Sequence, residues 1–289
     1  MDDRRDAPAN RRLDATVPAP AIITLTSDFG LADTYVAAMK GVILSLNPNA
    51  AIVDVSHAVR PQHIEQGAFL LEAASPYFPA DAIHIAVVDP GVGTERRGLA
   101  LQTSLGLFVG PDNGVLSPAL AEEVREGVGE GGGRVTLPEG TTGVELTNPR
   151  YHRLPVSHTF HGRDVFAPAA AHLSLGVALA ELGEAVVDAF VLPPFRARRR
   201  PDGSLAGRVI HVDGFGNLIT DMRAEDLSSS EVTVEIRGRR IAALRRAYAG
   251  IPGLAALVGS SGFLEIALAG GSAAAETGAD IGEPLTARG

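Results

Sequence analysis

The sequence predicts an α/β protein of two domains, in which a larger domain built around a parallel sheet precedes a smaller all-β domain. Three observations lead to this fold class. Short apolar runs alternate with helical patterns over residues 21–88, a charged stretch beginning at Pro193-Pro194 then interrupts the chain, and short strand-like runs separated by glycine and serine follow it. We therefore expect a disordered tail at 1–20, an α/β domain at 21–192, a linker at 193–204 and an all-β domain at 205–289.

The N-terminal domain begins with a regular alternation of strands and helices. Strands are expected at Ala21–Thr26, Ala51–Val55 and Ile83–Val88, with helices at Tyr35–Leu46 and Ile64–Ser75 between them. The sequence Asn-Pro-Asn at 47–49 ends the first helix. Because consecutive strands are connected through helices, neighbouring strands should be parallel and joined by right-handed crossovers.

The later elements are shorter. We expect two strands at Leu99–Thr103 and Leu107–Gly110, a helix around Leu120, a flexible loop at Gly127–Gly133 and an alanine-rich helix at Ala167–Leu175. Beyond the linker, strand-like runs occupy Gly207–Val212, Val232–Ile236 and Phe263–Leu268.

The composition of the 289 residues excludes several classes of function. A net charge of −9 argues against a nucleic-acid partner, because phosphate binding needs a basic face. The absence of cysteine excludes disulfides, thiolate metal sites and cysteine nucleophiles. No apolar run reaches the length of a membrane span and the N-terminus has no apolar signal core, so we expect a cytoplasmic protein without a membrane partner.

The expected central strand Ile83–Val88 runs directly into Asp89, a glycine-rich bend and Arg96. Open α/β sheets bind their ligands at loops that leave the carboxyl ends of strands. Taken alone, Asp89 fits the first position of a tight turn equally well. However, polar side chains are combined with glycine at three more expected strand ends, at 27–30, 161–164 and 213–217. With the stretch around Asp89 this makes four, and four such stretches together indicate a site.

Other interpretations of these stretches are weaker. Gly91-Val92-Gly93 lacks the third glycine and the following helix of a dinucleotide-binding fingerprint. The Asp-Phe-Gly sequence at 28–30 is not accompanied by the lysine and His-Arg-Asp motifs of a kinase. A metal site is the more serious rival, but its candidate ligands do not have the spacing of a known metal motif; they are Asp28, His57, His63, Asp89 and His161.

Seven blocks of the sequence together carry a family resemblance. They lie at Ile23–Gly30 with Asp33, Asp54–His57, Val88–Thr94, Pro111–Gly114, Thr159–Phe166, Asp213–Asn217 and Gly259–Ala267. In this order they resemble the S-adenosylmethionine hydrolase (adenosine-forming) family, whose relatives are the fluorinase and chlorinase enzymes. The resemblance implies an N-terminal α/β domain, a C-terminal β-barrel, and a homotrimer whose active sites lie between one subunit's N-terminal domain and a neighbour's C-terminal domain.

The resemblance also implies that Asp89, Arg96 and His161 surround an attacking water. The chemistry is reasonable, because the sulfonium of the substrate is already a good leaving group and the site need only orient a nucleophile. A carboxylate held by an arginine can accept a proton from water, while an imidazole relays or anchors it. Arg97 is a competing candidate; Arg96 is preferred because the family pattern has an arginine seven residues after the aspartate.

The same resemblance assigns the substrate-binding residues. Asp28 resembles the family's ribose-binding aspartate, although it would also suit a helix N-cap. Asp213 and Ser260 would hold the amino and carboxylate groups of methionine, Phe215 would lie against adenosine, and Asn217 would read the adenine edge, with Ser261 and Glu265 as companions. The plainer interpretations are a strand-end turn at 213–217, where the motif is one residue shorter than in the halogenases, and a flexible loop at 260–261.

The expected function is therefore conversion of S-adenosylmethionine and water to adenosine and methionine, without a cofactor or metal. A halogenase is the first alternative. Halogenases hold the halide with threonine and serine hydroxyls, whereas this chain has Val92 and Gly162 at the aligned positions. Further alternatives are a protein that binds adenosine or S-adenosylmethionine without turnover and a metal-dependent hydrolase.

Overall fold

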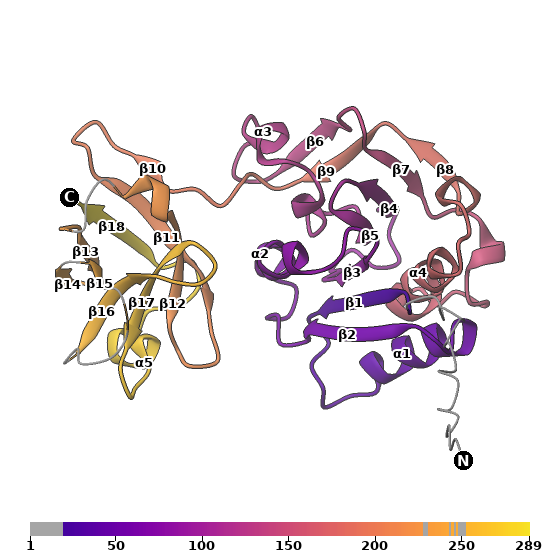
Figure 1. Ribbon diagram of the computed structural model, residues 1–289, viewed down its shortest axis with the longest axis horizontal. Coiled ribbons are helices and arrows are strands. Elements are labelled where there is room, and N and C mark those ends of the chain that lie inside the picture. Colours follow the sequence, from indigo (N-terminus) through magenta and orange to yellow (C-terminus); the bar gives the residue numbers. More distant parts are fainter. Residues whose placement is uncertain (1–19, 228–230, 243, 246, 248–252) are drawn as a thin grey trace, which may run out of the picture.

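The computed structural model describes residues 20–227, 231–242, 244–245, 247 and 253–289. Two domains lie side by side, joined by the segment between β9 (Asp188–Val191) and β10 (Arg198–Arg199) (Figure 1). The tail expected at residues 1–20 falls almost wholly outside the described residues. Within the described part of the chain, no helix is both long and apolar enough to cross a membrane.

The N-terminal domain is built on a seven-stranded sheet with the order β2-β1-β3-β5-β4-β7-β8. Its parallel part is as predicted and consists of β1 (Ile22–Ser27), β2 (Ala51–Ser56), β3 (Ile83–Val87) and β5 (Gly106–Pro111). The rest of the sheet is antiparallel and comprises β4 (Gly98–Thr103), β7 (Thr142–Glu145) and β8 (Glu184–Val186). The reversal begins where a two-residue connection joins β4 to β5, because so short a loop allows only antiparallel pairing.

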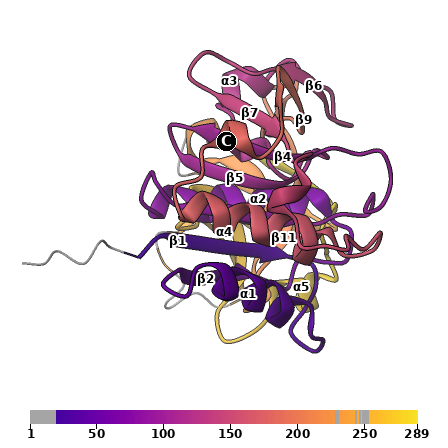
Figure 2. The same cartoon turned by 90° about the vertical axis from the view of Figure 1, so that its right-hand side faces the viewer.

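The central strand β3 is buried on both faces, which explains its uninterrupted apolar sequence. Ile83, Ile85 and Val87 face one core cluster, and Ala86 faces another. The first cluster includes residues of α1 (Tyr35–Leu46) and α4 (Ala167–Ser174), and the second includes Leu71 of α2 (Ile64–Ala74). Seen from its far side, the N-terminal domain presents α1 and α4, whereas α2 faces the other domain (Figures 1 and 2).

The segment from 117 to 136 differs in detail from expectation. The helix expected around Leu120 consists of a single 3-10 turn at 117–119 and the four-residue α3 (Glu122–Arg125). The glycine-rich stretch after it is a loop only as far as Gly132, because Gly133 begins β6 (Gly133–Thr136), which pairs with β9. Pairing with a distant strand compensates for the low strand propensity of glycine.

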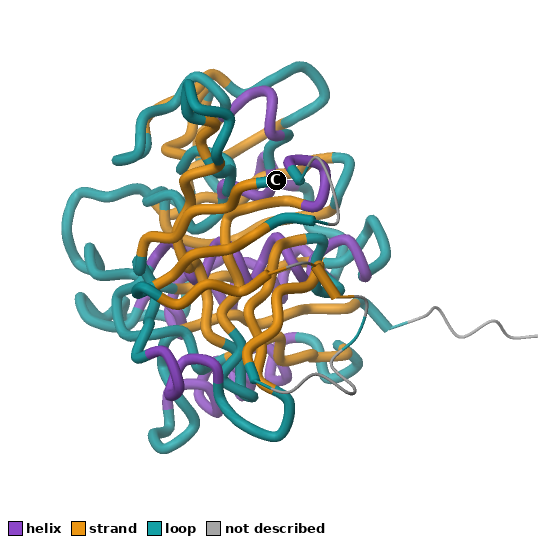
Figure 3. Tube along the Cα trace, turned by 90° about the vertical axis from the view of Figure 1, so that its left-hand side faces the viewer, coloured by secondary structure: helices purple, strands orange, loops and turns teal. Residues whose placement is uncertain are grey.

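The C-terminal domain is a curled nine-stranded sheet (Figure 3), which also carries the short helix α5 (Ala273–Thr277). Besides β10, its strands are β11 (Leu205–Val212), β12 (Leu218–Arg223), β13 (Thr233–Ile236), β14 (Arg239–Ala242), β15 (Leu244–Arg245), β16 (Leu254–Val258), β17 (Phe263–Leu268) and β18 (Pro284–Arg288). Strand β14 comes near β16, so the sheet is nearly closed into a barrel. The predicted all-β domain and the implied barrel are confirmed.

Helix α2 joins the two domains through an apolar contact. The ring of Phe69 packs edge-on against Phe195 of the linker and Phe263 of the barrel, at centroid distances of 5.8 and 5.7 Å. Ile210 and Ile219 of the barrel belong to the same buried cluster. The barrel is therefore packed on its own chain's α2 by continuous apolar burial.

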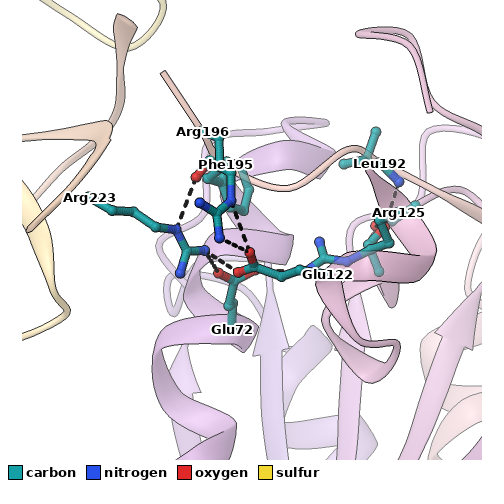
Figure 4. Close-up of polar contacts among 9 residues, drawn as sticks. Glu72, Glu122, Arg125, Leu192, Phe195, Arg196 and Arg223 are labelled. Atoms are coloured by element: carbon teal, nitrogen blue, oxygen red, sulfur yellow. Dashed lines mark hydrogen bonds and ion pairs between the residues drawn. The ribbon is translucent and has the colours of Figure 1, made fainter. Parts of the chain in front are cut away.

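Ion pairs reinforce this contact. Arg223 of the barrel donates to Glu72 at 3.0 Å and to Glu122, and Arg196 of the linker donates to Glu122 at 2.9 Å (Figure 4). Glu72 also accepts from Arg125, whose side chain is buried. Because the side chains of Arg223, Glu72 and Glu122 are all mostly buried, the pairs are less screened by salt than surface pairs. The network fixes the barrel to the N-terminal domain.

Candidate active site

The loop that leaves β3 holds a buried ion pair between Asp89 and Arg96. Their side chains are 5% and 11% exposed. Arg96 Nε donates to Asp89 Oδ1 at 2.9 Å and Arg96 Nη2 donates to Oδ2, so the guanidinium grips the carboxylate with two parallel bonds. The guanidinium also lies over the ring of Phe166, 5.3 Å from its centroid. The carboxylate is thereby held in one orientation.

His161 completes this cluster through the same arginine. Arg96 Nη2 lies 2.8 Å from His161 Nδ1. Arginine has no acceptor, so Arg96 must donate and Nδ1 must accept. Burial lowers the pKa of His161, and the positive charge of Arg96 lowers it further. The ring is therefore neutral near pH 7 and carries its proton on Nε2.

Glycines allow the loops to approach this closely. Gly93 has a φ of +77°, and a Cβ atom there would lie 2.3 Å from the carbonyl oxygen of His158. No other residue type fits this position without moving the backbone. The loop after β3 therefore lies directly against the segment that carries His161.

Asp28 lies in the loop after β1, beside this cluster. Its Oδ2 accepts from the backbone N–H of Gln62 at 2.7 Å. Burial raises the pKa of Asp28, and the charge of Asp89 is close enough to raise it further. The alternative role as a helix N-cap is wrong, because α1 begins at Tyr35 and Thr34 is its N-cap.

The two neighbouring arginines point to different partners. Arg97 donates to Asp112 at 2.9 Å and to Asp188 at 2.7 Å, and so belongs to an ion-pair cluster that ties β9 to the end of β5. Only Arg96 of the two contacts Asp89 and His161.

An aromatic group beside the site was not anticipated from the sequence. The rings of Phe29, Tyr35 and Phe160 pack together with centroid distances of 5.1 to 5.7 Å. A Cβ atom at Gly162 would lie 3.1 Å from Met39 Sδ and 3.2 and 3.3 Å from the rings of Phe160 and Phe29. Tyr35 is 46% exposed, an unusual value for a packed aromatic residue. This exposure marks the aromatic group as part of the site, and it cannot be read from the sequence.

The polar residues expected in the barrel form a preorganised loop between β11 and β12. Asp213 Oδ1 accepts from the N–H groups of Phe215 and Asn217 at 2.9 Å, and Oδ2 accepts from Asn217 Nδ2 at 2.9 Å. The side chain of Phe215 has no such support, and the residue is 82% exposed. The block is therefore a turn, as the plainer interpretation expected. It is more than a turn, because it also presents an aromatic side chain to solvent.

The second barrel loop, between β16 and β17, is a tight turn in which Ser260 and Ser261 are exposed. Glu265 behaves differently, since it is buried in β17 beneath the turn. A Cβ atom at Gly259 would lie 2.5 Å from Glu265 Oε2, so the glycine leaves room for the carboxylate.

The two remaining candidate metal ligands, His57 and His63, have other partners. His57 is bonded to Ser27 and Asp54, and His63 caps α2 by accepting from Gln66 N–H at 3.2 Å. Among the residues that the structure describes, no group of three or more histidine, aspartate or glutamate side chains could hold a metal ion.

Fold and site together define a class of protein: an α/β domain with an Asp–Arg–His cluster at the end of a central strand, followed by a β-barrel with two polar loops. Residues 23–183 match the family model of the SAM hydroxide adenosyltransferase N-terminal domain, and residues 207–286 match that of the C-terminal domain. The chain belongs to the SAM hydroxide adenosyltransferase family.

Individual relatives extend over both domains. The chain is 42% identical over 256 residues to the (R)-S-adenosyl-L-methionine hydrolase of Salinispora arenicola, covering 87% of this chain and 92% of that protein. It is 28% identical over 239 residues to a fluorinase of an Actinoplanes species, covering 73% of this chain and 74% of that protein. The crystal structure of an uncharacterized conserved protein from Thermotoga maritima matches with a TM-score of 0.78 at 32% identity, covering 92% of this chain and 99% of that one.

Proposed function

We propose that this protein hydrolyses S-adenosyl-L-methionine to adenosine and L-methionine. Its family and its relatives named as hydrolases support this activity. The observation that carries the mechanism is the sharing of one guanidinium between Asp89 and His161. This arrangement fixes a proton acceptor and a neutral imidazole at the same point, as water activation requires.

In the proposed reaction, a water oxygen bonds to C5′ of the ribose while the bond between C5′ and sulfur breaks. The electron pair of that bond stays on sulfur, which leaves as the thioether of methionine. Asp89 accepts a proton from the water and later releases it to solvent, while the Nε2–H of His161 can donate to the water oxygen and orient it. Since the sulfonium leaves as a neutral thioether, no acid is needed at the leaving group.

Charge in the N-terminal half of the site suits a cationic substrate. Asp28 and Asp89 contribute two carboxylates, and Arg96 offsets one of them. The remaining negative charge attracts a sulfonium. We assign Asp28 to the ribose hydroxyls, because a carboxylate accepts from both at once.

The same site disfavours halide as the nucleophile. A buried halide needs hydrogen-bond donors, and neither Val92 nor Gly162 has a side-chain hydroxyl. Gly162 is also packed closely against Met39, Phe29 and Phe160, which leaves little room for a side chain that could carry a hydroxyl.

We further propose that the active protein is a homotrimer in which Asp213, Phe215, Asn217, Ser260 and Ser261 complete a neighbouring subunit's site, with Glu265 supporting the second loop from below. The exposure of Phe215 supports this, because a rigid loop that presents an apolar ring to water is typical of a contact surface. The rigid attachment of the barrel to α2 also favours a site completed by another chain over one closed by domain motion.

Isotope labelling tests the reaction directly. The protein is incubated with S-adenosyl-L-methionine in ¹⁸O-labelled water, using both epimers at sulfur, and the products are analysed by mass spectrometry. We expect adenosine with one ¹⁸O at the 5′ position and unlabelled methionine, unchanged by a chelator. Unlabelled adenosine, methylthioadenosine or tight binding without turnover would contradict the proposal, and loss of activity with the chelator would favour a metal-dependent hydrolase.

A further inference from the structure

The backbone on both sides of Asp28 is bonded to His57, a residue of the loop that follows the neighbouring strand β2. Ser27 Oγ lies 2.7 Å from His57 Nδ1, and the N–H of Gly30 donates to the carbonyl oxygen of His57 at 2.8 Å. The N–H of Phe29 donates to Ser27 Oγ at 3.3 Å. Residues on both sides of Asp28 are therefore bonded, directly or through one hydroxyl, to the same histidine.

The direction of these hydrogen bonds follows from Asp54, the residue on the other side of His57 from Ser27. Asp54 Oδ2 accepts from Lys40 Nζ at 2.6 Å, and Asp54 Oδ1 lies 3.1 Å from His57 Nε2. A carboxylate can only accept, so Nε2 carries a proton and, in the neutral ring, Nδ1 accepts from the Ser27 hydroxyl. Ser27 Oγ is then free to accept from Phe29 N–H. Every member has a partner of the correct polarity.

A Ser–His–Asp sequence of contacts invites comparison with a nucleophilic triad, but the burial argues against that role. Ser27 is 1% exposed and His57 is 6% exposed. A nucleophile must reach the substrate, whereas this hydroxyl is enclosed between the imidazole and the Phe29 amide. The contacts are suited to holding a backbone in place.

The strand register shows how the histidine reaches this position. Leu25 pairs with Asp54 but Thr26 pairs with Ser56, so β2 contains one extra residue just before His57. A bulge of this kind re-aims the side chains that follow it. The same loop also supplies Gln62, at φ +66°, whose N–H binds the Asp28 carboxylate. The loop after β2 thus fixes both the backbone and the carboxylate of Asp28.

We propose that His57 is a positioning residue for Asp28: it sets the orientation in which the Asp28 carboxylate meets the ribose hydroxyls. This inference rests on the ribose-binding role proposed for Asp28. Because His57 is buried, we expect its effect on binding to pass through Ser27 and the Asp28 backbone. Its loss should therefore weaken recognition of the two hydroxyls specifically.

Calorimetry on the full chain tests this with adenosine and 2′,3′-dideoxyadenosine as probes. We expect His57→Ala to weaken adenosine binding about tenfold, the scale of one hydrogen bond to a charged group, and to leave dideoxyadenosine binding unchanged. His57→Asn keeps an acceptor oxygen near the position of Nδ1 and should restore part of the loss. His172→Ala removes a half-buried imidazole that contacts Tyr151; it is the control for loss of an imidazole elsewhere and should change the affinity for neither ligand.

Kinetics and a double variant complete the test. In His57→Ala the KM for S-adenosylmethionine should rise while kcat at saturation changes little, and adding His57→Ala to Asp28→Ala should cause no further loss. If His57→Ala fails to fold, Ser27→Ala and His57→Asn serve for the same comparison. Equal weakening of both ligands, or additive losses, would overturn the inference. Unchanged adenosine affinity in Asp28→Ala would overturn the ribose role as well, whereas a loss in Asp28→Ala without one in His57→Ala would overturn the inference alone.

Discussion

Replacing Asp221 by asparagine should stabilise the protein at neutral pH. The Asp221 side chain is 10% exposed in β12, and burial raises its pKa to about 6 from the ordinary 3.8. One oxygen accepts from the N–H of Arg208 at 2.8 Å, but the nearest Arg208 side-chain nitrogen is 4.0 Å from the other. The charged carboxylate therefore lacks a close cationic partner, and an amide would keep the hydrogen bond without the charge.

The magnitude follows from the two pKa values. An acid whose pKa is higher in the folded state costs stability above that pKa, and the cost disappears as the pH falls below its unfolded value. At about 1.4 kcal/mol for each pKa unit, the cost near pH 7.5 is about 3 kcal/mol, and near pH 4.5 it is about 1 kcal/mol. Asp221→Asn removes the charge and should therefore recover most of this cost in folding stability at each pH.

Urea unfolding of the wild type and Asp221→Asn at pH 7.5 and pH 4.5 measures the effect. The exposed Asp81→Asn is the control for loss of one negative charge, and its stability change should be small at both values. A variant less stable than the wild type at pH 7.5, or a gain equally large at pH 4.5, would refute the assignment of a buried and poorly compensated carboxylate.

Three further outcomes concern function. Asp89→Asn should lower kcat by on the order of 10²-fold with little change in affinity, whereas Asp28→Ala should weaken substrate binding about ten- to a hundredfold. Single-turnover kinetics and calorimetry separate the two, and near wild-type turnover in Asp89→Asn would move proton acceptance to another group. Added chloride or fluoride should give no 5′-halo-5′-deoxyadenosine; its detection by mass spectrometry would place the chain with the halogenases. Light scattering at assay concentration should show a trimer that loses activity when diluted to monomer, and a fully active monomer would contradict the shared site.

Much of the fold could be predicted because its signals are local. The bounds of α1 at Tyr35–Leu46 were predicted correctly, since helical periodicity and a proline-containing stop at 47–49 both act within a few residues. The directions of β7 and β8 could not be predicted, because a short strand has the same apolar pattern in either direction. Strand direction here depends on connection length and on distant partners.

In the candidate site too, local features could be predicted from the sequence and long-range contacts could not. The apolar strand and glycine-rich bend located Asp89, but the choice between Arg96 and Arg97 depends on which way each side chain points as the chain enters β4. Successive side chains point to opposite sides in an extended chain, so one arginine faces Asp89 and the other faces Asp112. Apart from the family's spacing of seven residues between aspartate and arginine, the sequence contains no signal for which arginine faces Asp89. Contacts such as Gln62 with Asp28 are likewise invisible, because they depend on a backbone amide from a distant loop.

The central position of Arg96 explains why one cation serves two purposes in the proposed reaction. Its two bonds to Asp89 orient the carboxylate, and its donation to His161 requires that imidazole to be an acceptor at Nδ1 and so directs the ring proton to Nε2. A lysine could supply the charge but could not bind two oxygens and a ring nitrogen in one plane. The site thus obtains a fixed proton acceptor and a fixed donor from a single planar group, and the sulfonium of the substrate supplies the remaining driving force without acid catalysis.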